Sequence, residues 1–138
     1  MNDVVYIALG SNVGNREITL VRARAAIANL RNTRILAETT IEETDPIGPI
    51  PQGPYLNQMI AVETALEPPV LLAALQRIER AAGRVRFLRW GPRTLDLDIV
   101  MIEGKELSDT TLTVPHPELP NRDFWQRELD ALKGVQHG

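Results

Sequence analysis

The sequence predicts an α+β fold of the ferredoxin-like class, in which an antiparallel sheet carries both helices on one face. Two segments show the apolar periodicity of amphipathic helices, and four show the composition or alternation of strands. Along the chain they follow the order strand, helix, strand, strand, helix, strand, which is the split βαβ repeat βαββαβ. Proline-rich stretches between these segments predict long substrate loops.

Residues 4–9 form a short apolar run closed by Gly10, which predicts a buried first strand. The turn GSNVGN that follows lacks the GK[ST] of a P-loop and the spacing of a dinucleotide fingerprint. We therefore expect a tight strand-to-helix turn there, with direct phosphate binding as the alternative. The first helix is predicted over residues 16–30, with Asn15 as its N-cap. Its apolar face consists of Leu20, Ala23, Ile27 and Leu30.

Residues 35–44 and 55–66 predict the second and third strands, and the proline-rich residues 47–54 between them predict a binding loop or lid. The second helix is expected to begin at Pro68 and Pro69, because proline is favoured in the first turn of a helix. It is expected to stop before Gly83, a residue type common just after a helix. Its apolar stripe consists of Leu71, Leu75, Ile78 and Ala82.

The last predicted strand covers residues 95–102 and alternates two sets of side chains. Residues two apart in a strand point to the same face, so Asp96 and Asp98 present their carboxylates side by side. One face carries Leu95, Leu97, Ile99 and Met101, and the other carries Asp96, Asp98, Val100 and Ile102.

Asp96 and Asp98 point to metal-assisted phosphoryl chemistry. Adjacent carboxylates raise each other's pKa unless a cation lies between them, and Mg²⁺ accepts one or two carboxylates together with waters and phosphates. Four arginines within residues 84–93 supply the forked donors that a polyphosphate needs. Two alternatives remain: a row of surface ion pairs, or a nucleic-acid patch with Phe87 and Trp90 as stacking residues. The net charge of −3 and a pI near 5.4 argue against nucleic acid.

Composition limits the class of protein. The 138 residues, 43% hydrophobic and 24% charged, indicate a single domain over 1–138 with a short polar tail after about residue 124. There is no cysteine, which excludes disulfides and thiolate metal sites. We find neither a signal peptide nor a run of the ~18 apolar residues needed to span a membrane. We therefore expect a cytoplasmic monomer that binds small molecules, without nucleic-acid or membrane partners.

The run R-W-G-P-R-T-L-D-L-D-I at residues 89–99 resembles the signature of the 6-hydroxymethyl-7,8-dihydropterin pyrophosphokinase family. Further matching blocks occur in the family's order, so the resemblance covers roughly residues 4–124. These blocks are G-S-N at 10–12, Y-L-N at 55–57, Q-R-I-E at 76–79, G-R-V-R at 83–86, T-V-P-H at 113–116 and N-R-x-F at 121–124.

The resemblance implies an enzyme that transfers the β,γ-diphosphate of ATP to the hydroxymethyl group of the reduced pterin and releases AMP, a step of folate biosynthesis. It implies that Asp96 and Asp98 hold two Mg²⁺ ions. The implied catalytic residues are Arg84, Arg86, Arg93, Asp96, Asp98 and His116. The implied ATP-binding residues are Gln76, Glu79, Arg84, Arg89, Trp90, Arg93, Ile99, Thr113, His116 and Arg122. Without the resemblance, His116 reads as a loop residue bonded to backbone, and Glu79 equally well as an ordinary polar helix edge.

For the pterin, the resemblance implies that two aromatic rings sandwich the heterocycle while an amide reads its edge. A carboxamide suits that role because it offers a donor and an acceptor together. The alternative for each aromatic is simple packing. The implied pterin-binding residues are Thr44, Asp45, Ile47, Tyr55, Asn57 and Phe124.

Two other functions stay open at this stage. A paralogue that binds pterin or nucleotide without turnover is suggested by the polar segment after Phe124, where the family usually continues with an apolar one. A small RNA-binding domain of ferredoxin-like topology is the second, although the acidic balance and the lack of an aromatic RNP-type strand argue against it.

Overall fold

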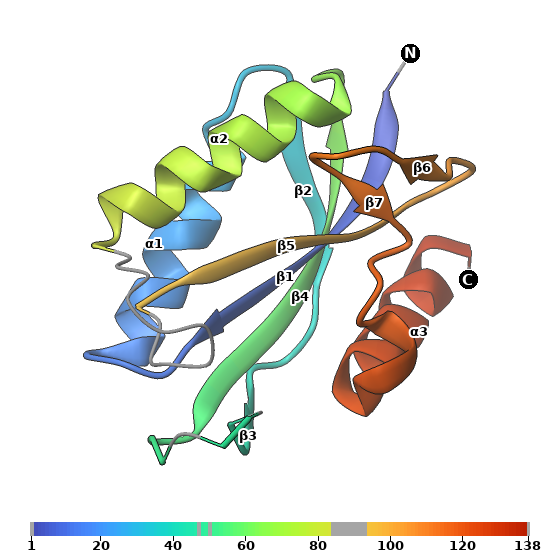
Figure 1. Ribbon diagram of the computed structural model, residues 1–138. Helices are drawn as coiled ribbons and strands as arrows, with labels where there is room; N and C mark the ends of the chain where they lie inside the picture. Colours follow the sequence, from blue (N-terminus) through green and yellow to red (C-terminus); the bar gives the residue numbers. More distant parts are fainter. Residues whose placement is uncertain (1, 47, 50, 84–93, 138) are drawn as a thin grey trace.

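The computed structural model describes residues 2–46, 48–49, 51–83 and 94–137 (Figure 1). Its main sheet has the strand order β2-β4-β1-β5, all neighbours antiparallel, and β3 also pairs with β4. The predicted combination of helices with an antiparallel sheet is confirmed. The strands are β1 (Asp3–Ser11), β2 (Thr33–Glu38), β3 (Glu42–Thr44), β4 (Tyr55–Thr64) and β5 (Asp96–Ile102).

Helices α1 (Arg16–Ala28) and α2 (Pro68–Ala81) pack over one face of the sheet, as predicted. The Asn15 side chain caps α1 by accepting a 3.1 Å hydrogen bond from the N–H of Ile18. The apolar stripes of both helices meet alternate residues of β1, β4 and β5 in one buried cluster. This cluster includes Val5, Ile7, Leu9, Leu20, Ala23, Ile27, Ile60, Val62, Leu71, Leu75, Leu97 and Ile99.

A third helix, α3 (Asp123–His137), covers the opposite face of the sheet (Figure 1). The prediction of helices on one face only is therefore wrong, and so is the prediction of a short polar tail after residue 124. Trp125, Leu129 and Leu132 are spaced four and three residues apart, so they share one helix face and bury themselves despite the polar residues between them. Their partners in the sheet are Tyr6, Ala8, Met59, Ala61 and Val100.

The predicted second strand is divided into β2 and β3 because a side chain interrupts its ladder. Thr39 still donates its backbone N–H to the carbonyl of Met59 at 2.9 Å, but the N–H of Met59 bonds to the Thr39 hydroxyl at 3.0 Å. The carbonyl of Thr39 accepts instead from the side chain of Gln58 at 2.6 Å. Side-chain bonds of this kind compete with regular pairing, so the strand stops and resumes at Glu42.

A β-bulge in β5 breaks the predicted alternation after Ile99. Tyr6 pairs with Met101 and Ile7 with Ile99, so Val100 is an extra residue on β5. Val100 and Met101 consequently both face α3, and the side chain of residue 102 returns to the α1–α2 side. The predicted faces of Met101 and Ile102 are therefore wrong, whereas the predicted alternation of residues 95–99 is confirmed.

After β5 the chain forms a small hairpin and crosses the sheet's edge toward α3. The hairpin pairs β6 (Leu107–Ser108) with β7 (Thr113–Val114), and a cis peptide bond joins Val114 to Pro115. The N–H of His116 then donates a 2.8 Å hydrogen bond to the carbonyl of Val100, the bulge residue. A 3₁₀ turn, η1 (Leu119–Asn121), leads into α3. Within the described ranges, no helix combines the length and apolar character needed to cross a bilayer.

Glu128 is a buried carboxylic acid on α3. Its side chain is 6% exposed, and neither carboxylate oxygen has a hydrogen-bond partner among the described residues. Burial, followed by the nearby carboxylate of Glu42, raises the pKa of Glu128 to about 8, while the guanidinium of Arg127 opposes the shift. Arg127 itself pairs with Glu42 at 3.3 Å. The folded protein therefore favours a protonated Glu128.

We predict that Glu128 makes stability fall as pH rises. Because its folded pKa lies above its usual value of 4.5, the folded state is not penalised below pH 4.5, and the penalty grows until pH reaches about 8. Each unit between the two pKa values corresponds to about 1.4 kcal/mol, so the span from 4.5 to about 8 sets an upper limit of about 5 kcal/mol on the stabilisation expected for Glu128→Gln at pH 8. Urea unfolding between pH 5 and pH 8.5 measures this, and Asp130→Asn is the exposed control on the same helix. Parallel stability curves for the parent and Glu128→Gln would contradict the assignment.

Candidate functional site

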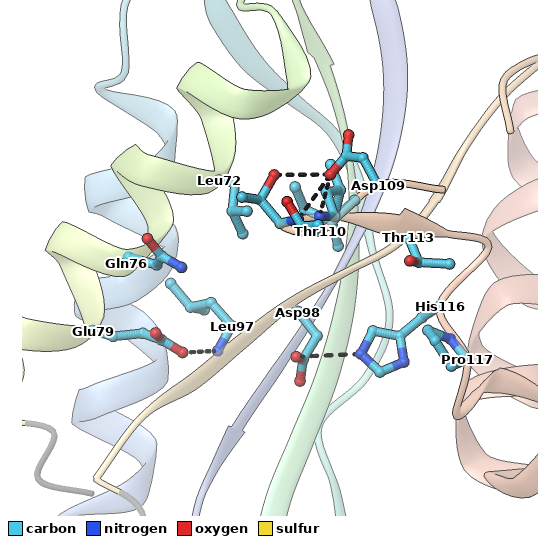
Figure 2. A pocket seen from close by; sticks show the side chains of 13 residues that line it. Leu72, Gln76, Glu79, Leu97, Asp98, Asp109, Thr110, Thr113, His116 and Pro117 are labelled. Atoms are coloured by element: carbon cyan, nitrogen blue, oxygen red, sulfur yellow. Dashed lines mark hydrogen bonds and ion pairs between the residues drawn. The ribbon is translucent and has the colours of Figure 1, made fainter. Parts of the chain in front are cut away.

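A cavity of about 310 Å³ lies beside β5, between α2 and the segment 109–117 (Figure 2). Helix α2 contributes Leu72, Gln76 and Glu79 to its wall, and β5 contributes Asp98 and the residues on either side of it. The cavity thus brings five predicted ATP-binding residues, from three separate parts of the chain, around one space. They are Gln76 and Glu79 of α2, the buried Ile99 of β5, and Thr113 and His116 of the segment 109–117.

Asp109 shapes the wall opposite α2. One carboxylate oxygen accepts hydrogen bonds from the N–H of Thr111 at 2.8 Å, the hydroxyl of Thr111 at 2.9 Å and the N–H of Leu112 at 2.8 Å (Figure 2). These bonds favour the charged form and hold the pKa of Asp109 below its usual value. They also fix the turn that delivers Leu112 and Thr113 to the cavity.

Glu79 fastens α2 to β5 at the point between the two aspartates. Its side chain is buried, and Oε2 accepts a 2.8 Å hydrogen bond from the N–H of Leu97 (Figure 2). Because β5 lies at one edge of the described sheet, its outer backbone groups need partners from outside the sheet. Glu79 is such a partner, so the interpretation of Glu79 as an ordinary polar helix edge is wrong.

Asp98 faces His116 across the cavity's inner end. The distance from His116 Nε2 to Asp98 Oδ1 is 3.7 Å, longer than a hydrogen bond (Figure 2). His116 Nδ1 accepts a 3.0 Å hydrogen bond from the N–H of Glu118, so the proton of the neutral ring sits on Nε2. Burial, then the charge of Arg122, lowers the pKa of His116, with the Glu118 carboxylate opposing. The ring is therefore a neutral donor whose N–H points into the site.

Trp125, which falls within the predicted polar tail, lies against two predicted ATP-binding residues. Its ring meets that of His116 edge-on, with centroids 5.0 Å apart and planes at 85°. The guanidinium carbon of Arg122 lies 4.3 Å from the centroid of the same ring. The apolar spacing of residues 125, 129 and 132 was the sequence signal that could have revealed this residue.

On the α3 side of the sheet, β3 and β4 gather three predicted pterin-binding residues. Thr44 pairs with Tyr55, and the side-chain amide of Asn57 donates a hydrogen bond to the Thr44 hydroxyl. Asn57 is 7% exposed. Phe124 lies in the first turn of α3 and contacts Trp125 edge-on, with ring centroids 6.3 Å apart. The stacking of a pterin between Tyr55 and Phe124 remains a prediction.

Gly10 connects this region to the aspartates. On β1 it pairs with Asn57 on one side and with Asp96 on the other, so the three residues form one row across the sheet. A Cβ at Gly10 would lie 3.2 Å from Asn57 Oδ1 and 3.4 Å from a ring carbon of Tyr55. The absence of a side chain at position 10 thus leaves room for both. Two strand spacings of ~4.8 Å separate Asn57 from Asp96.

The turn predicted from residue 10 begins later, because residues 10–11 still belong to β1, and Asn12 then contacts the proline-rich loop. The Asn12 side chain donates hydrogen bonds to Gln52 Oε1 at 2.7 Å and to the carbonyl of Gly53 at 3.1 Å. Asp45, predicted to contact pterin, is exposed. Six predicted site residues lie outside the described residues: Ile47, Arg84, Arg86, Arg89, Trp90 and Arg93.

Asp96 and Asp98 suit a hard divalent cation. Both are half-buried, both lie on the α3 side of β5, and both offer oxygen ligands. The described ranges contain no group of three or more His, Cys, Asp or Glu side chains arranged to hold a metal. A pair of carboxylates fits Mg²⁺, which completes its octahedral coordination with waters and substrate phosphates.

Comparison with known proteins gives consistent results. The model of the 7,8-dihydro-6-hydroxymethylpterin-pyrophosphokinase family matches residues 6–134. The chain is 42% identical over 124 residues to the 2-amino-4-hydroxy-6-hydroxymethyldihydropteridine pyrophosphokinase of Bacillus subtilis, covering 90% of this chain and 74% of the relative. It is 44% identical over 119 residues to the enzyme of that name in Haemophilus influenzae, covering 86% and 74%.

Among solved structures, the chain resembles a crystal structure described as HPPK-DHPS in complex with substrates. The TM-score is 0.53 at 14% sequence identity, and the match covers 79% of this chain and 30% of the other. At that identity the likeness concerns the fold alone.

We predict that removing the Glu79 carboxylate loosens β5. Glu79→Ala leaves the buried N–H of Leu97 without an acceptor, which should cost about 1–3 kcal/mol of stability. Glu79→Gln keeps an acceptor oxygen of similar reach and is the matched control. Amide hydrogen exchange should show faster exchange at Leu97 in Glu79→Ala than in Glu79→Gln. Equal protection of that amide in both variants would show that the side chain does not hold the strand.

Proposed function

Because the chain belongs to the 7,8-dihydro-6-hydroxymethylpterin-pyrophosphokinase family, we propose how its residues carry out the family's reaction. Enzymes of this family transfer pyrophosphate to hydroxymethyldihydropterin in folate synthesis, with ATP as co-substrate. The substrate hydroxyl oxygen attacks the β-phosphorus, the bond from that phosphorus to the bridging α,β-oxygen breaks, and AMP leaves. The protein has to position two substrates and neutralise phosphate charge.

The row Asn57–Gly10–Asp96 is the observation that supports this proposal best. The reaction joins a flat heterocycle to a triphosphate, so a group that reads the heterocycle must lie within one substrate length of the groups that hold the phosphates. Asn57 and Asp96 lie on the same sheet face, two strand spacings apart, with only a glycine between them. The pterin is proposed to lie over Asn57, with its hydroxymethyl group directed toward Asp96.

The cavity beside β5 is proposed to take the adenosine of ATP. Its volume of about 310 Å³ lies at the lower end of the range for small-molecule sites. Leu72 and Ile99 offer apolar contact for a purine, and Gln76 and Thr113 offer polar groups at the rim. From this cavity the triphosphate would extend past His116 toward the α3 side of the sheet.

At the phosphates, each described residue has a separate role in the proposal. The neutral His116 donates its Nε2–H to a phosphate oxygen, which involves no charge change in the protein. Arg122 supplies positive charge. Asp96 and Asp98 would hold two Mg²⁺ ions. When bound, Mg²⁺ neutralises phosphate charge and lowers the pKa of the attacking hydroxyl.

Further parts of the proposal rest on residues and properties beyond the described site. Arg84, Arg86 and Arg93 are proposed to contact the transferred phosphates, and Arg89 and Trp90 to contact ATP. The sheet order β2-β4-β1-β5 supports assigning the ferredoxin-like class to the strands other than β3. We also propose that the domain acts as a monomer in the cytoplasm. The burial of Trp125, Leu129 and Leu132 of α3 supports a catalytic protein over a paralogue without turnover, because that alternative was suggested by a polar segment after Phe124.

We predict AMP as the nucleotide product. Purified protein mixed with MgATP and 6-hydroxymethyl-7,8-dihydropterin should release AMP in a one-to-one ratio with the pterin diphosphate, as resolved by chromatography. Omission of Mg²⁺ is the control and should abolish both products. ADP in place of AMP would contradict diphosphate transfer, and binding of both substrates without product would indicate a non-catalytic paralogue.

In the same assay, Asp96→Asn should lower turnover by at least about 100-fold, equivalent to about 2.7 kcal/mol of transition-state stabilisation. The side chain keeps its size, so circular dichroism should show an intact fold. Asp130→Asn, an exposed change on α3, is the matched control and should retain parent turnover. Near-parent turnover in Asp96→Asn would remove Asp96 from the metal site.

A further inference from the structure

Trp125 lies where the core under α3 meets the proposed phosphate site. Its side chain is 2% exposed and belongs to the cluster that joins α3 to the sheet. The same ring contacts His116 edge-on at 5.0 Å and carries the Arg122 guanidinium at 4.3 Å. A residue that only filled the core would not need to contact both polar side chains.

Arg122 depends on this ring for its position. The structure gives its guanidinium no hydrogen bond or ion pair to any described residue, and its Nε is buried without a partner in that part of the chain. An arginine side chain without such contacts samples many rotamers, and fixing one of them costs conformational entropy. A cation–π contact offsets part of that cost.

His116 is held from three directions, and Trp125 provides one of them. Its backbone N–H bonds to Val100, and its Nδ1 accepts from the N–H of Glu118. These two bonds fix the chain and one edge of the ring. The edge-on contact with Trp125 limits rotation of the ring, so that Nε2 stays directed toward Asp98.

We propose that Trp125 is a positioning residue for the nucleotide phosphates, which aligns the Arg122 guanidinium and the His116 ring before ATP binds. The proposal rests on the proposed function, because it takes His116 and Arg122 as phosphate-contacting groups. Preorganisation of this kind lowers the ordering cost of binding. Loss of the Trp125 ring should therefore weaken ATP binding more than pterin binding. The pterin would also use Asn57 on the other side of Gly10, and it would meet Trp125 only through Phe124, whose ring centroid lies 6.3 Å from that of Trp125.

Three variants separate this role from simple packing. Trp125→Leu removes the ring and keeps an apolar side chain. Trp125→Phe restores an aromatic face and edge. Leu132→Ala removes packing from the same buried cluster but has no ring contact with Arg122 or His116. Thermal unfolding of all three variants measures how much stability each one loses, so that losses of nucleotide affinity can be compared at equal loss of stability.

The main measurement is calorimetric affinity for α,β-methylene-ATP with Mg²⁺, together with KM for ATP and for the pterin. Trp125→Leu should weaken the analogue's affinity by about 10-fold or more, with a clearly smaller rise in KM for the pterin, and Trp125→Phe should recover most of the lost affinity. Leu132→Ala should unfold at lower temperature but keep the parent affinity. If Leu132→Ala and Trp125→Leu weaken the analogue equally at equal loss of stability, the effect is packing and the proposal is overturned.

A double-variant comparison tests the route through Arg122. In an Arg122→Gln background, Trp125→Leu should weaken the analogue by clearly less than in the parent, because the guanidinium it positions is gone. Equal losses in both backgrounds would overturn the route through Arg122. Analogue binding that responds to Trp125 as expected, in a protein that forms no AMP, would overturn the proposed function and leave the positioning role supported. AMP formation by the parent protein, together with unchanged affinity for the analogue in Trp125→Leu, would support the proposed function and overturn the positioning role.

Discussion

The site depends on the outer edge of β5, along which no further strand of the described sheet pairs. A strand at the edge of a sheet leaves backbone N–H and C=O groups that need partners from elsewhere. In this chain the N–H of Leu97 bonds to the Glu79 carboxylate, and the carbonyl of Val100 accepts the N–H of His116. Both partners also line the cavity. The bonds that complete the strand therefore also bring α2 and the segment after β7 to the two sides of Asp98.

The bulge at Val100 determines which side chains of β5 pack against α1 and α2 and which face α3. Before the bulge, Leu97 and Ile99 face α1 and α2, while Asp96 and Asp98 face α3. After it, the strand's phase is shifted by one residue, so the end of the strand is again buried under the first two helices. The extra residue also carries the carbonyl that docks His116. A regular strand would not combine these contacts, which agrees with the common occurrence of bulges beside active sites.

Sequence periodicity predicted the features that depend on residues close together in the chain. Asp96 and Asp98 share a face because a strand repeats every two residues, and Asn15 caps α1 because its oxygen reaches the N–H three residues on. Features decided by long-range contacts were missed. The break at Thr39 depends on Gln58 and Met59 of β4, and the burial of Trp125 depends on the sheet face it covers. A polar average over residues 125–138 concealed three apolar residues at helical spacing.

Gly10 shows why the order of strands matters for the chemistry. The middle strand of the row separates the amide at Asn57 from the carboxylate at Asp96, and any side chain there would project into the space between them. With glycine, that space stays open while the backbone still pairs on both sides. The sheet thus sets the spacing between the proposed pterin position and the proposed metal position by its strand separation. In the proposed function, the distance that the substrates have to bridge is consequently set by backbone pairing, and Asn57 on β4 and Asp96 on β5 supply the contacts at its two ends.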